Sequence, residues 1–288
     1  MDNSAIFDRA PNKCTLKMIP EQRHMGINFL SAIVDHKKQE VASAKKRISE
    51  NQLIKRAAQR DIKRPFLENL KRYNGINTVN IIAEIKRASP SKGDISIGLN
   101  PEILAREYEK GGACALSVLT ETKYFKGSFD DFKKARSASS LPMLRKDFMI
   151  SSYQIYESCI LGADAVLLIA RILTKTQLKD YLDLSFELKL DALVEINSEE
   201  DLKSANDANA KLIGINNRNL DSFDTDINTA MRLFSLLDAD QIAVAASGIT
   251  KKEDIIKNQA SGIYNFLIGE SLVRADNTVD FLKSLCSL

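Results

Sequence analysis

The sequence predicts an α/β protein that folds as a (β/α)8 TIM barrel with an N-terminal helical extension. Two observations support this class. Eight short apolar segments follow one another from residue 80 onward, and stretches with helical periodicity separate them. The segments show little alternation between apolar and polar residues, which is typical of parallel strands covered on both faces. Eight strand–helix units in about 200 residues fit a closed barrel, whereas a doubly wound open sheet usually has fewer strands.

The predicted strands are rich in β-branched residues and leucine, and they span residues 80–86, 114–120, 142–146, 165–170, 192–196, 212–216, 241–247 and 264–269. Helices are predicted between them, among others at 101–112, 153–162, 176–190 and 229–237. Gly112 and Gly162 end two of these helices, where a left-handed cap favours glycine. No Gly-x-Gly-x-x-Gly motif follows the first strand, so the dinucleotide-binding form of the open sheet lacks its main support.

The residues ahead of the barrel fall into two parts. Residues 1–24 lack periodicity, and we expect a poorly ordered tail. Residues 25–78 are expected to form a helical extension packed on the barrel, which occupies residues 79–288. Apolar residues recur at helical spacing in the first half of this extension. Its polar face is basic, and it is either solvent-exposed or a cap that attracts an anionic substrate. The basic residues are Lys37, Lys38, Lys45, Lys46 and Arg47.

Composition argues against several classes of partner. Lys and Arg number 41 against 38 Asp and Glu, which gives no support for nucleic-acid binding. The four cysteines are far apart and form no Cys-x-x-Cys pair, as in cytoplasmic proteins with reduced thiols. The N-terminus has no apolar run that would predict a signal peptide or a membrane span. We therefore expect a cytoplasmic protein with neither membrane nor nucleic acid as partner. A monomer is expected as well, although none of these observations bears on the oligomeric state.

Histidine is scarce in this chain. Its two histidines, His24 and His36, both precede the first predicted strand. A histidine-based triad or a histidine-rich metal site within the barrel is therefore excluded, and no metal is expected. Chemistry in the barrel must use lysine, arginine, carboxylates, hydroxyls or backbone groups.

Polar residues stand where the predicted strands end. The carboxyl ends of barrel strands form the active-site face, so these side chains should converge on one rim. They are Glu84, Lys86, Thr120, Lys146, Glu195, Asn216 and Arg218. Glu84 and Lys86 lie two residues apart and therefore point to the same side of the strand, toward the barrel interior. They are either a buried ion pair of purely structural value or an acid and a base for catalysis, since a partly dry site shifts pKa values toward neutrality.

Glycine-containing turns follow the last two predicted strands. Ser247-Gly248 comes after the seventh and Gly269-Glu270 after the eighth. Loops at these two places often hold phosphate in this fold, because glycine lets backbone N–H groups approach an anion. Ser89 and Lys92, in the loop after the first strand, could close over the same anion. The alternative is that the glycines serve only tight turns.

Six motifs in the same order give the chain a resemblance to the indole-3-glycerol phosphate synthase family over roughly residues 25–275. They are IIAEIKRASPSKGDI (81–95), LTETKYFKGSFDDF (119–132), LPMLRKDFMI (141–150), LVEIN (193–197), IGINNRNL (213–220) and FLIGESLVR (266–274). The resemblance implies a carboxy-lyase of tryptophan biosynthesis. It would close the indole ring of 1-(o-carboxyphenylamino)-1-deoxyribulose 5-phosphate, a small phosphorylated substrate, with loss of CO2 and water and without a cofactor.

The resemblance also implies roles for individual residues. Lys146 matches the general acid that protonates the carbonyl oxygen, and Glu195 matches the base of the later dehydration. Lys86 matches a lysine near the substrate's carboxylate and phosphate, and Glu84 a glutamate that orients these groups. Asn216 and Arg218 match polar substrate-binding residues. The residues expected around the aromatic ring are Phe125, Phe148 and Leu168. The phosphate site would comprise Ser89, Ser247, Gly248, Gly269 and Glu270.

One position departs from the family pattern. The family usually has Glu-Ser-Gly-Ile after the seventh strand, whereas this chain has Ala246 in place of the glutamate. Either the enzyme tolerates the loss, or the chain is an attenuated or diverged phosphate-binding relative. A second enzyme of the same fold, phosphoribosylanthranilate isomerase, would need Cys at the end of the first strand and Asp at the sixth. Those places hold Glu84 with Lys86 and Asn216 with Asn217, which disfavours the isomerase.

Overall fold

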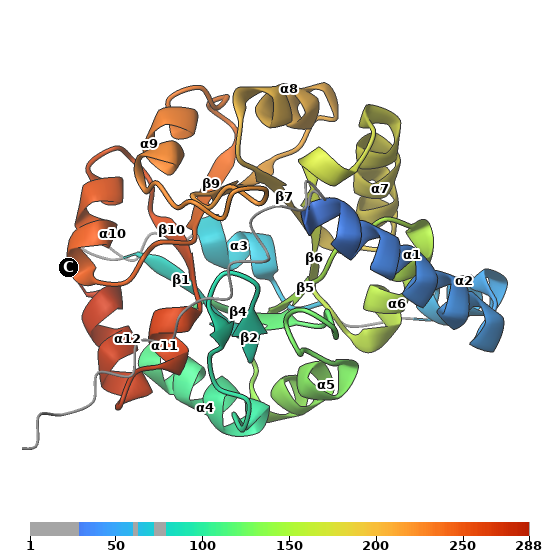
Figure 1. Ribbon diagram of the computed structural model, residues 1–288, viewed down its shortest axis with the longest axis horizontal. Helices are drawn as coiled ribbons and strands as arrows, with labels where there is room; N and C mark the ends of the chain where they lie inside the picture. The colour runs from blue at the N-terminus through green and yellow to red at the C-terminus, as the bar shows by residue number, and fades with distance from the viewer. Residues whose placement is uncertain (1–28, 60–62, 72–78, 288) are drawn as a thin grey trace, which may run out of the picture.

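The computed structural model describes residues 29–59, 63–71 and 79–287. Within these ranges eight parallel strands close into a barrel, and helices surround it (Figure 1). The predicted TIM barrel is thereby confirmed and the open-sheet alternative is wrong. The strands run around the barrel in the order β1-β10-β9-β8-β7-β6-β5-β4. Their bounds are β1 Asn80–Ile85, β4 Ala115–Leu119, β5 Met143–Lys146, β6 Ala165–Ile169, β7 Asp191–Ile196, β8 Leu212–Asn216, β9 Ile242–Ala246 and β10 Asn265–Ile268.

Helices follow the barrel strands, and most begin at a side chain that caps the first turn. They are α4 Pro101–Gly111, α5 Phe129–Ala138, α6 Ser152–Leu161, α7 Lys175–Glu187, α8 Glu199–Asp207, α9 Asn228–Phe234, α10 Lys252–Gln259, α11 Glu270–Val273 and α12 Thr278–Cys286, with a 3-10 turn η2 at Ala170–Ile172. The hydroxyl of Ser198, for example, accepts from the N–H of Asp201 at the start of α8. Gly112 and Gly162 cap α4 and α6 with φ of 93° and 88°, so both predicted left-handed caps are confirmed.

Alternate residues of each strand face two different cores. Ile81, Ala83 and Ile85 of β1 pack outward against the helices. Ile82 faces the barrel interior together with residues such as Leu144 and Leu193. The loop after β1 forms a small antiparallel pair, β2 (Ala88–Ser89) and β3 (Gly93–Asp94). The sequence did not predict this pair.

The N-terminal extension contributes three described helices. In α1 (Phe29–Arg47), Leu30 and Ile33 pack against the barrel's interior cluster, and α2 (Glu50–Ala57) packs against α6 (Figure 1). A capping box between Ser49 and Gln52 starts α2, so the region expected as one helical segment is two helices. The expected tail, residues 1–24, lies outside the described residues.

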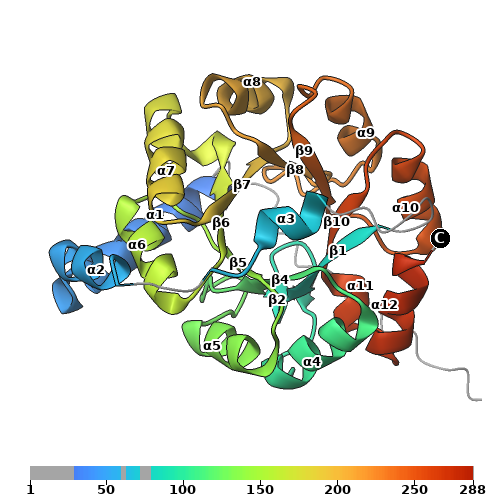
Figure 2. The ribbon, with the colours of Figure 1, turned by 180° about the vertical axis from the view of Figure 1, so that it is seen from behind.

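The third helix, α3 (Phe66–Lys71), closes the opposite end of the barrel (Figure 2). Phe66 and Leu70 are fully buried in the interior cluster. The amide of Asn80 at the start of β1 donates to the Leu70 carbonyl at 3.1 Å. One end of the barrel is thus plugged by α3, which leaves the carboxyl ends of the strands for a site. Among the described residues, none of the helices has the length and apolar character needed to cross a membrane.

Candidate active site

A large pocket opens at the carboxyl ends of the strands. Thr120 and Leu168 are the predicted residues that do not line it, and the others do. Those that line it include Glu84, Lys86, Ser89, Phe125, Lys146, Phe148, Glu195, Asn216, Arg218, Ser247, Gly248, Gly269 and Glu270. They come from loops or strand ends all around the barrel. The parallel topology places every strand's carboxyl end on the same rim, which is why residues far apart in sequence meet here.

On the β1 side, Glu84 and Lys86 form an ion pair. The Lys86 Nζ lies 2.7 Å from Glu84 Oε1, and both side chains are largely buried. A Cβ added to Gly269 would lie 2.6 Å from that same carboxylate oxygen. Gly269 is therefore required by the space that Glu84 occupies, which is a reason for glycine beyond a tight turn.

Across the pocket, Lys146 at the end of β5 and Glu195 of β7 form a second pair. Lys146 Nζ lies 3.5 Å from Glu195 Oε2, and the Asn216 amide donates to Glu195 Oε1 at 3.1 Å. Asn216 in turn accepts the backbone N–H of Arg218 at 3.0 Å. Glu195 is thus held from two sides, with one oxygen toward the ammonium and the other toward the amide.

The opposite charges in the pocket stabilise the ionised forms of Glu84 and Lys146. Burial alone would raise the pKa of the Glu84 carboxyl, but the ammoniums of Lys86 and Lys146 outweigh it and hold that pKa below its usual value. Burial alone would lower the pKa of Lys146, but the carboxylates of Glu195 and Glu84 outweigh it and raise that pKa. The expected shift toward neutrality is therefore wrong for both groups. Lys146 keeps its proton and Glu84 stays ionised.

The turns after β9 and β10 line the pocket. Ser247 and Gly248 both have positive φ, 67° and 76°, and a Cβ on Gly248 would come within 2.8 Å of the Thr225 side chain. The amide of Asn217 donates to the Ser247 carbonyl at 3.0 Å, which fixes the turn. The turn thus combines a non-glycine residue in the left-handed region with a glycine.

Two loops meet over the pocket. The guanidinium of Arg218, after β8, donates to the hydroxyl of Ser91 in the loop between β2 and β3, and to Thr225 Oγ1 at 3.1 Å. Ser91 lies 3.5 Å from Ser89, so the predicted binding residues Ser89 and Arg218 are joined through one hydroxyl.

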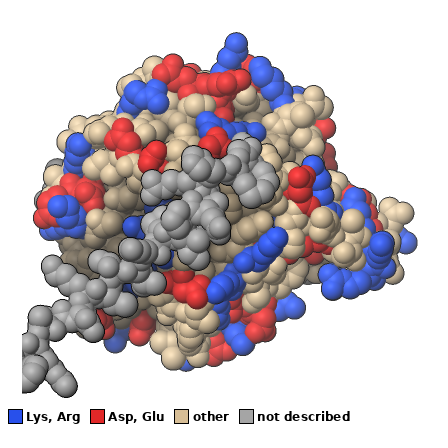
Figure 3. All heavy atoms as spheres, viewed as in Figure 1, with Lys and Arg blue, Asp and Glu red and all other residues tan. Residues whose placement is uncertain are grey.

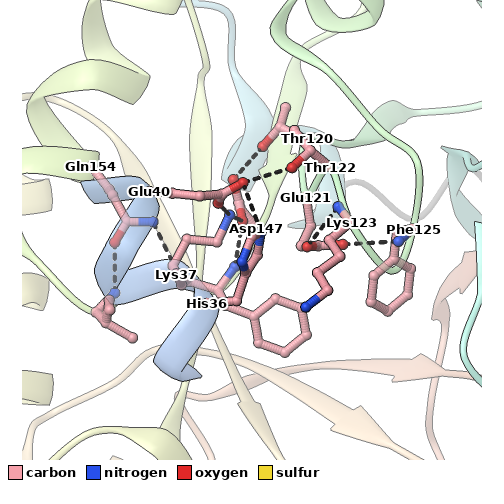
Figure 4. Close-up of polar contacts among 12 residues, drawn as sticks. His36, Lys37, Glu40, Thr120, Glu121, Thr122, Lys123, Phe125, Asp147 and Gln154 are labelled. Atoms are coloured by element: carbon pink, nitrogen blue, oxygen red, sulfur yellow. Dashed lines mark hydrogen bonds and ion pairs between the residues drawn. The ribbon is translucent and has the colours of Figure 1, made fainter. Parts of the chain in front are cut away.

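An aromatic slot lies beside the Lys146–Glu195 pair. The rings of Phe125 and Phe148 have centroids 6.0 Å apart and an interplanar angle of 42°. The buried carboxylate of Glu121 accepts the backbone N–H groups of Lys123, Tyr124 and Phe125 at 2.7 to 3.0 Å, and these bonds shape the loop that presents Phe125 (Figure 4).

Leu168 does not line the pocket, and its expected place beside the aromatic ring is wrong. Its side chain is fully buried in the outer core, among residues that pack against the helices. Its neighbours Leu167 and Ile169 face the interior and line the pocket instead. The reason is the two-residue alternation of a strand, which sends adjacent side chains to opposite faces.

Other pocket residues were not predicted. Phe29, Leu30 and Ile33 reach the pocket from α1, and Phe29 contacts Tyr124 and Phe223 edge to face with centroids 5.0 and 5.1 Å apart. The helical spacing of Phe29 and Ile33 indicated an apolar face, but it gave no sign of which surface that face would cover.

Ala246 ends β9 at the pocket wall, directly opposite Asn216 and Leu267 in the strand register. The pocket there has a methyl group where the family pattern has a carboxylate. Both lysines nonetheless have carboxylate partners, Lys86 in Glu84 and Lys146 in Glu195. Among the described residues, no group of three or more His, Cys, Asp or Glu side chains has an arrangement that would hold a metal ion.

Comparisons with known proteins agree with one another. The model of the family described as indole-3-glycerol phosphate synthase matches residues 30–285. A curated indole-3-glycerol phosphate synthase of Desulfosudis oleivorans is 57% identical over 258 residues, which covers 90% of this chain and 98% of the relative. One from Syntrophobacter fumaroxidans is 47% identical over 86% of this chain and 93% of its own length. One from Legionella pneumophila is 45% identical over 90% of this chain and 98% of its own length.

Two solved structures with low sequence identity are similar in fold. A thiamine phosphate pyrophosphorylase of Pyrococcus furiosus superimposes with a TM-score of 0.56 at 14% identity, covering 73% of this chain and 94% of that one. A protein named KGPDC from Streptococcus mutans gives a TM-score of 0.55 at 12% identity, over 72% and 95%.

Proposed function

The chain belongs to the indole-3-glycerol phosphate synthase family, and on that premise we propose which of its residues carry out the reaction. The reaction is that of a carboxy-lyase in tryptophan biosynthesis. It closes the indole ring of 1-(o-carboxyphenylamino)-1-deoxyribulose 5-phosphate with release of CO2 and water. One observation supports the assignment most strongly: the Lys146–Glu195 and Lys86–Glu84 pairs face one pocket beside an aromatic slot.

Lys146 acts as the general acid. As the ring carbon attacks the substrate carbonyl, the carbonyl electron pair moves to oxygen, and the protonated Lys146 donates its proton there. The raised pKa of Lys146, which Glu195 and Glu84 sustain against burial, keeps the donor loaded at neutral pH. CO2 then leaves, and its bonding electrons return to the ring system.

Glu195 acts as the base of the dehydration. It accepts the proton lost from the ring in this step, while the hydroxyl takes up a proton from solvent and leaves as water. Its 3.5 Å distance from Lys146 offers a short path for returning the accepted proton to that lysine. The Asn216 amide keeps the carboxylate turned toward the substrate. Both catalytic groups then end the cycle in the state in which they began.

Lys86 and Arg218 bind the anionic groups of the substrate, and Glu84 orients Lys86 through their 2.7 Å contact. The phosphate lies against the Ser247-Gly248 and Gly269-Glu270 turns and the Ser89 hydroxyl. Phe125 and Phe148 contact the aromatic ring of the substrate, because their apolar rings exclude water from that part of the pocket.

Activity is measured with the purified protein and the carboxyphenylamino-deoxyribulose phosphate, by the fluorescence of the indole product. Lys146→Ala should lower kcat by about a hundredfold or more while the protein stays folded, since a positioned acid contributes about 10² to 10⁴. The matched control is Lys211→Ala, an exposed lysine paired with Asp240 before β8, which should keep full activity. Wild-type turnover by the Lys146 variant would refute the acid role.

The comparisons give no support to the attenuated or diverged relative suggested by Ala246. The intact pairing of both lysines supports a working site without a third carboxylate.

The remaining expectations concern organisation and partners. We keep the division into a tail (1–24), a helical extension (25–78) and a barrel (79–288), supported by the packing of α1 and α3 on the barrel ends. A monomer in the cytoplasm that binds no nucleic acid is proposed as well. Basic and acidic side chains are interspersed over the face shown in Figure 3, which favours a small anionic substrate over a polyanion.

A further inference from the structure

Lys37 of α1 is buried, although the basic face to which it was assigned was expected to be solvent-exposed or to attract an anionic substrate. Its side chain is 4% exposed, whereas the neighbouring Lys38 is 64% exposed. The Lys37 ammonium lies 2.8 Å from Asp147 Oδ1 and 2.5 Å from Glu40 Oε2. It therefore reaches from α1 into the barrel rim, as Figure 4 shows. The basic face is thus not uniform, and one of its members has a different task.

Asp147 directly follows Lys146 and is nearly fully buried. Its Oδ1 accepts the backbone N–H of Phe148 at 2.8 Å as well as Lys37. Its Oδ2 accepts Thr120 Oγ1 at 2.6 Å and the Arg145 guanidinium at 3.1 Å. The Asp147 carboxylate thus fixes the chain between Lys146, the proposed acid, and Phe148, one of the two rings of the aromatic slot.

Glu40 extends the same network to the loop after β4. It accepts the Thr122 hydroxyl at 2.6 Å and lies 3.4 Å from His36 Nε2. Thr122 follows Glu121, the residue whose carboxylate shapes the loop of Phe125. Both walls of the aromatic slot are therefore tied to α1 through the two carboxylates that Lys37 bridges.

We propose that Lys37 is a positioning residue: its ion pairs with Asp147 and Glu40 set helix α1, Lys146 and the Phe125–Phe148 slot in one geometry for the ring closure. The inference rests on the proposed catalytic role of Lys146.

A purely stabilising role explains the arrangement less well. A buried ion pair contributes little net stability, because desolvation offsets the attraction. Asp147 would keep Arg145, Thr120 and the Phe148 N–H as partners without Lys37. The apolar contacts of Leu30 and Ile33 hold α1 against the barrel, but such contacts are non-directional and do not fix the helix in one position. The directional contacts of Lys37, one turn after Ile33, set the register of this helix face.

The experiment compares Lys37→Met with Lys38→Met, its exposed neighbour on the same helix, in steady-state kinetics and thermal unfolding. Lys37→Met should lower kcat about tenfold to a hundredfold with a smaller rise in KM, because a misplacement near 1 Å costs about that much. Lys38→Met should behave as wild type. A purely structural role would lower Tm and leave kcat and KM of the folded protein unchanged, and that outcome would overturn the proposal.

A double-mutant cycle sharpens the test. If the pair acts as a unit, Lys37→Met with Asp147→Asn should lose no more kcat than the more impaired single variant. Losses that multiply would overturn the proposal. Should Lys37→Met fail to fold, Glu40→Gln removes one partner at a half-buried position, and it should lower kcat/KM about threefold or more. Wild-type kcat/KM in that variant would equally overturn it.

Wild type and Lys146→Ala are assayed alongside. An inactive wild type would mean that the proposed function itself fails. An active wild type with an inactive Lys146→Ala variant and a fully active Lys37→Met variant would mean that only the positioning role fails.

Discussion

At the residue scale, the site stores its charges in pairs before substrate arrives. Each buried ammonium faces a carboxylate, and each would be expensive to bury alone. The pairing raises the pKa of Lys146 against the effect of burial and lowers that of Glu84 in the same way. For the acid role proposed for Lys146 this pairing is an advantage, because the ammonium is protonated and held in place, so little reorganisation remains for the reaction.

Leu167 and Leu168 offer a residue-scale prediction because they are adjacent leucines on opposite faces of β6. Leu167→Ala should raise KM about tenfold, since a lost apolar contact in a pocket is worth about that much. Leu168→Ala should lower the free energy of unfolding by about 2–5 kcal/mol through a cavity in the outer core, and leave KM unchanged. Kinetics and urea unfolding of both variants check this. An equal change of KM in both would contradict the assigned faces.

Strand β6 also shows why the inward-facing residues could not all be predicted from the sequence. Polar strand ends such as Glu84 and Glu195 favour the inward face, because a charge between barrel and helices needs partners of its own. Arg145 has such partners in Asp147 and Glu157. The segment AVLLIA has no polar marker, so sequence alone could not tell Leu167 from Leu168. Lys37 was misplaced for a related reason: a run of basic residues reads as a solvated face unless the buried partner, Asp147, is known.

At the element scale, the agreement between predicted and observed strands is close because each is a continuous apolar run bounded by turn residues. All eight have bounds within one residue of the prediction at either end. Shorter elements escaped prediction. The pair β2–β3 has two residues in each strand, and α3 has six residues, of which Phe66 and Leu70 are buried against the barrel end. A periodic pattern of apolar residues can be recognised only over several repeats, and these elements are too short to contain them.

The contact between α1 and the end of β5 gives an element-scale prediction about pH. Burial would raise the pKa of Asp147, but the charges of Lys37 and Arg145 outweigh it and lower that pKa. The contribution of Asp147 to stability is therefore present above its unfolded-state pKa, near 4, and is lost as the pH falls through the lower folded-state pKa. Burial would lower the pKa of Lys37, but the carboxylate of Asp147 outweighs it and raises that pKa. The contribution of Lys37 to stability is therefore present below its unfolded-state pKa, about 10.4, and is lost as the pH rises through the higher folded-state pKa.

Asp147→Asn should therefore lower the free energy of unfolding by a constant amount from about pH 5 to 9, and the difference from wild type should shrink below about pH 4. Urea unfolding at a series of pH values measures this. The exposed Asp183→Asn variant on α7 is the control and should run parallel to wild type. A difference that grows toward acid pH would show that Asp147 is not held ionised in the folded state.

At the scale of the whole molecule, the two ends of the barrel have different tasks. The carboxyl ends hold ion pairs, a strained turn at Ser247 and loops that meet over a pocket. The other end is closed by the apolar side of α3 and by hydrogen bonds to the first residues of the strands. Such a division lets the chain accept less stable arrangements where the chemistry takes place, because the opposite end supplies stability.

Phe66 tests that division. Its ring is fully buried against the barrel interior at the closed end. Phe66→Ala should lower the free energy of unfolding by about 3–5 kcal/mol, a large part of the total of about 5–15 kcal/mol for a domain. At a temperature where the variant is still folded, kcat and KM should stay within about twofold of wild type, because the closed end is separated from the pocket by the packed interior layer of the barrel.

The control for Phe66→Ala is Phe186→Ala on α7, where the ring is 85% exposed and its removal should change neither stability nor kinetics. Chemical unfolding and steady-state kinetics on the same preparations decide the outcome. If kcat of the folded Phe66 variant fell in step with stability, the interior layer would have to transmit displacements from α3 to Lys146. Stability and chemistry would then be coupled along the strands rather than divided between the two ends.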